Sequence, residues 1–298
     1  LEAERLKQFA SFPMGLFFYL FFQFAIYRAR RYRLTRTVWR GVRFWMTGSG
    51  WGYAMRVGLW ALLVSLTLGI ALPWRQAALE RYKMRHTSYG DLSGEFTGTG
   101  SEFFKRAWGL WLALSLMLVL PGALSIVAPP TATIYLFEPL ALPFMYAVYK
   151  AIEWRWWASG IRFGEVTFKS NLDRGDLIGL YWKVAGWFVL IFVAMAVWVS
   201  IVGGIGFALS GVRGTAAQKS VAVFQQLPVL VGIGFGYVAA ILAFWAVARI
   251  YLVHDVWQRI AQSTAAAGVG AADDVQAKGD PASALGEGFA DSLDVVGF

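Results

Sequence analysis

Long apolar segments alternate with short basic stretches along most of this chain. Apolar runs long enough to cross a hydrocarbon layer of roughly 30 Å recur six times. They are Phe12 to Tyr27, Trp51 to Trp74, Phe103 to Val127, Ala132 to Tyr149, Leu177 to Leu209 and Val221 to Val253. This pattern predicts an α-helical polytopic membrane protein with about five to six membrane segments.

Three polar stretches between these segments resemble one another. They are Arg43 to Gly50, Glu95 to Ser101 and Arg162 to Ser170, and each leads into a new apolar segment. Aromatic and β-branched residues that alternate with polar ones, followed by Gly-rich turns, favour short β-strands over helices. We therefore expect one short cytoplasmic strand in each repeat. A sheet of two or three such strands would need helices packed against it.

A basic and aromatic heptad also occurs twice, as Arg31 to Thr37 and Arg81 to Thr87. Together with the strand-like stretches, it indicates a repeated transmembrane domain over residues 1–267 and a separate tail over 268–298. The repeat units cover about residues 28–87, 88–160 and 161–260. Gly69 and Pro139 are predicted to break membrane helices.

The net charge of +9 is concentrated near the ends of the apolar segments. Seven Lys and Arg residues lie in Arg28 to Arg43, six in Arg75 to Arg106 and five in Lys150 to Arg174. The positive-inside rule makes these stretches cytoplasmic. In a membrane protein such charge indicates topology and contact with anionic lipid headgroups, and not nucleic-acid binding.

Aromatic and basic side chains at the segment ends are expected to lie at the level of the lipid headgroups. The residues so predicted are Arg31, Tyr32, Arg81, Tyr82, His86, Trp154, Arg155 and Trp156.

The segment Trp51 to Trp74 presents a conflict, because basic stretches predicted to be cytoplasmic flank both of its ends. One solution is a re-entrant hairpin with Ser65, Thr67 and Gly69 at its tip. The other is a plain span with one basic stretch translocated against the rule. Both remain open on the sequence.

The tail carries six acidic residues against one lysine. Leu285 and Phe289 follow helical spacing, and Glu287 and Asp291 lie on other faces. An acidic amphipathic helix of this kind would dock on the cytoplasmic basic loops. A flexible solubilising tail is the alternative.

The sequence contains little catalytic chemistry. It has no cysteine and two histidines, without metal-ligand spacing, so we predict no catalytic residues, no metal, no cofactor and no enzyme activity. Glu138, followed by Pro139, is the candidate intramembrane functional residue, since a carboxylate at membrane depth is costly. Arg56 and Lys183 are its candidate partners. A position near the external surface is the alternative for Glu138.

Several motifs together resemble the YjgN family of bacterial inner-membrane proteins, a family of unknown function. They are Trp39 to Phe44, Thr67 to Gly69 with Pro73-Trp74, Arg81-Tyr82 with His86-Thr87 and Tyr89-Gly90, Glu153 to Trp157, and Gly286 to Asp291. The resemblance implies a proteobacterial inner-membrane location and no assigned reaction. Relatives carry a further copy of the repeat upstream, so we expect an amino-terminal part before Leu1. Some relatives are encoded near a membrane-associated zinc metallopeptidase, which implies an accessory role.

The sequence supports two main functional hypotheses. The favoured one is a multi-pass inner-membrane scaffold or accessory subunit, with its tail in the cytoplasm, that binds another membrane protein such as a metallopeptidase or a second copy of the chain. Exposed strand edges and the absence of a catalytic set motivate it. The alternative is a transporter or channel for a small solute, ion or lipid that uses broken helices and Glu138.

Overall fold

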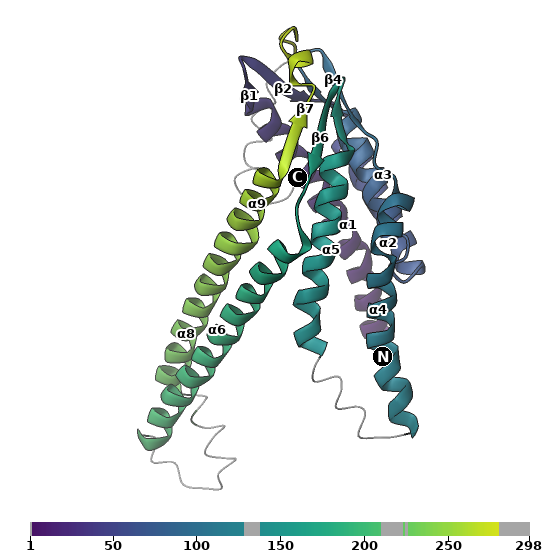
Figure 1. Cartoon of the computed structure of the whole chain (residues 1–298). Helices are drawn as coiled ribbons and strands as arrows, with labels where there is room; N and C mark the ends of the chain where they lie inside the picture. The colour runs from purple at the N-terminus through teal and green to yellow at the C-terminus, as the bar shows by residue number, and fades with distance from the viewer. Residues whose placement is uncertain (1, 128–137, 210–222, 224–225, 280–298) are drawn as a thin grey trace. The chain divides into compact units, whose positions relative to one another are not determined.

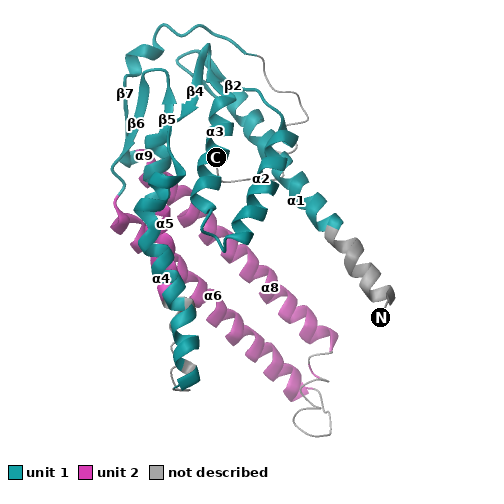
Figure 2. Cartoon of the chain, turned by 90° about the vertical axis from the view of Figure 1, so that its right-hand side faces the viewer, with its two compact units in different colours: residues 1–132, 151–172, 262–298 teal, residues 133–150, 173–261 magenta. Residues whose placement is uncertain are grey.

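The computed structural model describes residues 2–127, 138–209, 223 and 226–279 (Figure 1). The chain folds into two compact units, coloured separately in Figure 2. The first unit contains residues 1–132, 151–172 and 262–298, and the second contains residues 133–150 and 173–261.

A seven-stranded antiparallel sheet lies in the first unit, and its strands follow one another in chain order (Figure 1). The strands are β1 (Val38–Trp39), β2 (Val42–Met46), β3 (Thr87–Tyr89), β4 (Leu92–Phe96), β5 (Ile161–Phe163), β6 (Val166–Ser170) and β7 (Thr264–Ala267). The predicted strands are therefore present. The expectation of one strand per repeat was wrong, because each repeat contributes a hairpin of two.

Each hairpin joins a short strand to a five-residue strand through a two-residue turn. Arg40 and Gly41 both have positive φ, 48° and 80°, as a type I′ turn requires. Such turns match the twist of the flanking strands and so fix the register of the pair.

The same register joins one hairpin to the next. The last residue of each five-residue strand lies opposite the first residue of the following short strand. The three pairs are Met46 with Thr87, Phe96 with Ile161, and Ser170 with Thr264. Every helical segment between hairpins therefore leaves from one strand and returns to its neighbour.

The helices of the first unit include α1 (Glu2–Arg36), α2 (Gly50–Leu66), α3 (Leu72–Arg85) and α4 (Gly100–Val127). Helix α5 (Glu138–Gly160) belongs to it from residue 151 onward. Between the helices, two glycines are enclosed by aromatic rings, at Gly100 against Trp74 and at Gly160 against Phe96.

Helices α2 and α3 form a hairpin that begins and ends at the sheet. Ser49 caps α2, where its hydroxyl accepts a hydrogen bond from the Gly52 amide. The chain reverses between Thr67 and Ala71, and Gly69 adopts a φ of 90°. A single straight span over residues 51–74 is therefore wrong. The predicted tip residues Thr67 and Gly69 lie in this turn.

The second unit contains α6 (Arg174–Leu209) and α8 (Leu227–Val247), and α8 continues through a π-helix at Ala248–Asp255 into α9 (Val256–Ser263). Small residues let α6 and α8 approach closely, because Gly232 lies against Val202 and Gly236 against Trp198. The Trp198 indole also donates to the Gly232 carbonyl at 2.8 Å.

Three helices in the described part of the chain are long and apolar enough to cross a membrane. They are Gly100–Leu124, Arg174–Leu209 and Leu227–Ser263. The prediction of five to six membrane segments was therefore wrong. Phe12 to Tyr27 lies within α1 and Trp51 to Trp74 is divided between α2 and α3, and neither is among the three. Part of Ala132 to Tyr149 lies outside the described residues.

The sequence predicted too many membrane segments because some of the apolar residues form a protein core. Tyr27, Met46, Tyr53, Val57 and Leu79 are buried against one another between α1, α2, α3 and β2. An apolar run can thus be used for packing between helices instead of contact with lipid. The sequence pattern cannot distinguish these two uses.

Trp156 provides a test of this core. It is 2% exposed, stacks on Phe103 with ring centroids 4.8 Å apart, and donates its indole N–H to the Thr99 carbonyl at 3.1 Å. We expect Trp156→Ala to lower the free energy of unfolding by about 3–5 kcal/mol, because it opens a cavity. Denaturant unfolding in detergent micelles would measure this.

The matched control is Trp108→Ala on α4, since Trp108 is 55% exposed. This change should cost less than about 1 kcal/mol. Equal losses for the two variants would contradict the assignment of Trp156 to the core.

Candidate functional site

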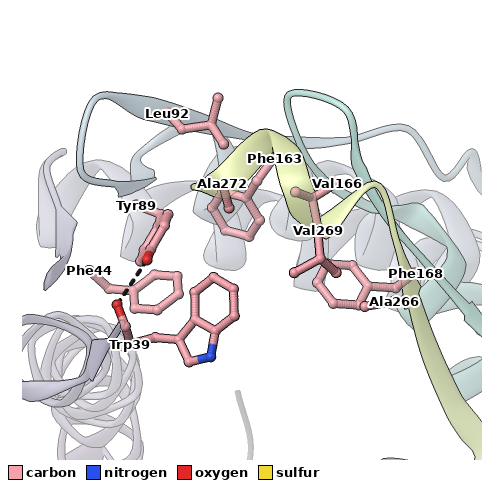
Figure 3. Close-up of a pocket in the computed structure, with 10 residues that line it drawn as sticks. All are labelled: Trp39, Phe44, Tyr89, Leu92, Phe163, Val166, Phe168, Ala266, Val269 and Ala272. Atoms are coloured by element: carbon pink, nitrogen blue, oxygen red, sulfur yellow. Dashed lines mark hydrogen bonds between the residues drawn. The ribbon is translucent and has the colours of Figure 1, made fainter. Parts of the chain in front are cut away.

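One face of the sheet carries an apolar cavity of about 300 Å³ (Figure 3). Five aromatic side chains line it, namely Trp39, Phe44, Tyr89, Phe163 and Phe168. Five aliphatic ones complete the lining, namely Leu92, Val166, Ala266, Val269 and Ala272. The lining residues of β6 are two positions apart, because alternate side chains of a strand point to the same face of a sheet.

A segment that we call the strap, Gly268 to Gln276, lies across this face of the sheet after β7. It starts at Gly268 with a φ of 74° and contains a 3₁₀ turn at Val269–Ala272. Ala272 is buried against Tyr89 and Val166, and Val275 packs on the same cluster. The strap therefore forms part of the cavity wall.

Polar contacts fasten the far end of the strap to the β3–β4 turn. The Asp91 amide donates to the Gln276 carbonyl at 3.1 Å, and the Gln276 amide donates to the Asp91 carboxylate at 3.1 Å. Gly90 is required at this turn, since a Cβ there would overlap the Gln276 carbonyl oxygen.

The cavity surface is almost entirely carbon, whereas Arg40 and Asp273, the chain neighbours of the lining residues Trp39 and Ala272, are charged. We call this charged pair the mouth of the cavity. Arg40 forms an ion pair with Asp273 of the strap, and both side chains are more than half exposed. The Arg40 guanidinium also lies 4.6 Å from the centre of the Trp39 ring. Inside, the Tyr89 hydroxyl already donates to the Trp39 carbonyl at 2.8 Å (Figure 3).

The outer edge of β1 lacks a strand partner among the described residues. Strands β3 and β5 each pair on both sides, whereas β1 pairs with β2 alone. Because Phe44 N–H bonds the Thr37 carbonyl, the alternation of an antiparallel ladder turns the backbone groups of Val38 outward. Val38 is 51% exposed and Trp39 is 40% exposed.

A cluster of buried charged residues connects helices α1, α3 and α5 of the first unit. Glu80 and Lys83 of α3 form an ion pair at 2.5 Å, with each side chain 9% exposed. The Trp157 indole of α5 donates to the second oxygen of Glu80 at 3.1 Å. One turn away, Gln76 donates to Glu153 at 3.1 Å.

Arg30 of α1 belongs to the same cluster, because it is 8% exposed and close enough to feel the charge of Glu80. Burial lowers the pKa of Arg30 and of Lys83, and the Glu80 carboxylate acts in the opposite direction on both. Glu80 therefore stabilises both buried cations, and Glu153 adds a smaller favourable interaction with Lys83. Sequence reasoning missed Glu80 and Lys83, since the basic residues around them were interpreted as signals of topology and of contact with lipid headgroups.

The residues predicted for the headgroup level mostly make contacts within the protein. Tyr82 donates to the Ser49 carbonyl at 3.0 Å, and its ring contacts His86 at 4.6 Å. Burial, together with Arg85 and Arg56, lowers the pKa of His86, and its Nδ1 lies 3.3 Å from the Thr47 hydroxyl. Arg81 donates to the Gly98 carbonyl at 3.3 Å.

The remaining members of that set lie on α1 and α5. The Tyr32 ring lies 5.2 Å from the Arg36 guanidinium, and Arg31 is half-buried beside it. Arg155 donates to the Leu172 carbonyl, and Trp154 meets Trp157 edge to face at 5.4 Å. Trp156 is buried in the core of the first unit and does not lie at a surface.

The candidate intramembrane residues show no common site in their described contacts. Helix α5 begins at Glu138, with Pro139 in its first turn, and the Glu138 side chain lies outside the described residues. Arg56 bonds the Gly52 carbonyl at 2.9 Å and lies over the Tyr82 ring at 4.4 Å. Lys183 is exposed on α6 of the second unit.

The predicted docking residues of the tail, Leu285, Glu287, Phe289 and Asp291, also lie outside the described residues. Earlier tail residues do contact the sheet, through the strap described above. In the described ranges 2–127, 138–209, 223 and 226–279, no group of three or more His, Cys, Asp or Glu side chains could hold a metal ion.

Comparison with known proteins finds one family. Residues 2–133 match the family described as "Bacterial protein of unknown function (DUF898)". No curated protein and no solved structure matches the chain.

The buried cluster yields a prediction about stability. We expect Glu80→Gln to lower the free energy of unfolding by about 3–5 kcal/mol, because Lys83 and Arg30 would lose their counter-charge while still buried. Denaturant unfolding of the purified chain in detergent would measure the loss.

Glu102→Gln is the control, since Glu102 pairs with Arg106 on α4 and both side chains are more than two-fifths exposed. Its cost should stay below about 1 kcal/mol. If the two variants lose similar stability, the Glu80 cluster does not hold the helices together.

Proposed function

Residues 2–133 match the YjgN family of bacterial proteins of unknown function, and we propose that the chain is an inner-membrane scaffold that receives a strand from another membrane protein. The bound strand adds to the outer edge of β1. The three apolar helices, Gly100–Leu124, Arg174–Leu209 and Leu227–Ser263, anchor the scaffold in the bilayer.

The observation that carries this proposal is the regular pairing of the hairpins. Strands β3, β5 and β7 each pair, on the side of the preceding repeat, with a five-residue strand in the same register. Strand β1 is the equivalent short strand of its own hairpin, and its corresponding side is open among the described residues. A partner strand equivalent to β2, β4 or β6 fits this position.

Strand addition also suits the chemistry of the edge. Main-chain hydrogen bonds supply affinity for an added strand, and side-chain contacts on alternate positions supply specificity. The Trp39 side chain, which is 40% exposed, offers a large apolar contact beside the edge. Natural sheets seldom leave an edge open unless a partner or a protective feature covers it.

The partner we favour is a membrane-associated metallopeptidase, as the family resemblance implies, and a second copy of the chain is the alternative. The basic stretches around Arg28 to Arg43 face the cytoplasm and contact anionic headgroups, and the tail lies on the same side. The transporter alternative depends on Glu138, whose side chain lies outside the described residues.

The substitution Val38→Pro tests whether a partner strand adds to the outer edge of β1. Since the Val38 amide points away from β2, Val38→Pro should leave the hairpin intact and remove the hydrogen-bond donor that an added strand needs. We expect a photo-crosslinker placed at Arg36 to give an adduct of discrete mass in native membranes. The adduct should fall at least fivefold in the Val38→Pro background.

Val38→Thr is the matched control, because it keeps the amide and the β-branched shape, and its adduct should persist. A crosslinker at Leu68, in the α2–α3 turn, controls for non-specific capture. Mass spectrometry of the adduct separates a peptidase from a second copy. Absence of an Arg36 adduct, or an adduct insensitive to Val38→Pro, would contradict strand addition.

A further inference from the structure

The scaffold proposal makes no use of the apolar cavity or of the charged groups at its mouth. An apolar cavity beside a cation suits an amphiphilic ligand with an anionic head. We propose that the cavity is a binding site for a single-chain fatty acid, with the alkyl chain inside and the carboxylate on Arg40. In this site the Asp273 carboxylate of the strap occupies the position of the ligand carboxylate.

The lining of the cavity determines which part of a ligand can enter it. The surface of the cavity is almost entirely carbon, and the Tyr89 hydroxyl is engaged by the Trp39 carbonyl at 2.8 Å. A polar group placed inside would lose its hydrogen bonds to water without replacement. The part of a ligand that enters is therefore apolar.

The volume narrows the class of ligand. About 300 Å³ lies at the lower end of the range for small-molecule pockets, roughly 300–1,000 Å³. Such a cavity accepts one alkyl chain of medium length. The two chains of a phospholipid do not fit together within it.

The charged pair at the mouth determines the head group of the ligand. Arg40 lies beside Trp39, which lines the cavity, and its partner Asp273 directly follows the lining residue Ala272. A guanidinium that already holds a carboxylate at this point is suited to hold another, because the fork of donors matches both oxygens. An amphiphile with an anionic head thus satisfies the chain and the mouth together.

The strap makes the exchange of carboxylates feasible. The Arg40–Asp273 pair is more than half exposed on both sides, and such pairs contribute little to stability. The strap keeps two other attachments when Asp273 is displaced, the β6–β7 ladder and the Gln276–Asp91 pair. Asp273 can therefore leave Arg40 without unfolding of the sheet.

The test uses the full chain in nanodiscs of phosphatidylcholine, with a photoreactive diazirine dodecanoic acid as the probe and unlabelled dodecanoic acid as the competitor. We expect adducts on peptides that contain Phe44 or Phe168. Ala266→Phe fills the cavity and should abolish these adducts. Ala265→Phe is the matched control, because the neighbouring side chain of β7 points to the opposite face of the sheet.

Variants at the mouth test recognition of the head group. Arg40→Asn keeps a residue that tolerates positive φ and should weaken binding about five- to tenfold. Arg40→Lys keeps the charge but loses the fork of donors, so it should weaken binding less than Arg40→Asn. Asp273→Asn removes the competing carboxylate and should tighten binding about two- to fivefold. Asp274→Asn, the adjacent acid, should change nothing.

Two results would overturn the proposal. Equal labelling of Ala266→Phe and Ala265→Phe would show that the chain does not enter the cavity. Methyl dodecanoate that competes as well as the free acid, with Arg40→Asn unchanged from the parent chain, would show that no anionic head is recognised. Labelling confined to the membrane helices would count as partition into lipid and would also reject the site.

Discussion

The antiparallel pairing between successive hairpins is the constraint on which the rest of this structure depends. Each five-residue strand pairs with the next short strand in one repeated register, so the chain must return to the sheet after every helical excursion. Helices α2 and α3 accordingly form a hairpin, and α8 with its continuation returns the chain from α6 to β7. Because a one-residue slip would move every side chain to the other face, this register also places the aromatic residues in one cavity.

Buried charge is a consequence of gathering the helix ends beneath the sheet. The same basic residues that resemble topology signals in the sequence lie where α1, α3 and α5 meet, and there they require a counter-charge. Glu80 provides it for Lys83 and for Arg30, and Trp157 satisfies its second oxygen. Such a cluster adds little net stability over an apolar core, but loss of one member is costly.

Trp39 belongs to both features of the sheet for which we propose a role, the open edge and the cavity. It lies on the open strand β1, where a partner strand would add, and its ring is part of the cavity wall. Its neighbour Arg40 belongs to the tight turn and to the ion pair with the strap. Partner binding and ligand binding would therefore act on the same hairpin, and the structure gives a physical route for each to affect the other.

The sequence by itself determined that short strands recur between helical segments, and that Thr67 and Gly69 are the candidate turn residues if Trp51 to Trp74 returns to its starting side. It also determined the YjgN resemblance, because turn residues and strand alternation are local signals. Only the tertiary structure decided which apolar segments form helices long enough to cross a membrane and that Trp156 and Glu80 are buried. It also decided that ten residues from all three repeats, β7 and the strap line one cavity. The physical reason is that burial depends on contacts between distant segments, such as Tyr89 with Ala272. The local sequence pattern around an apolar side chain is the same whether lipid or protein covers that side chain.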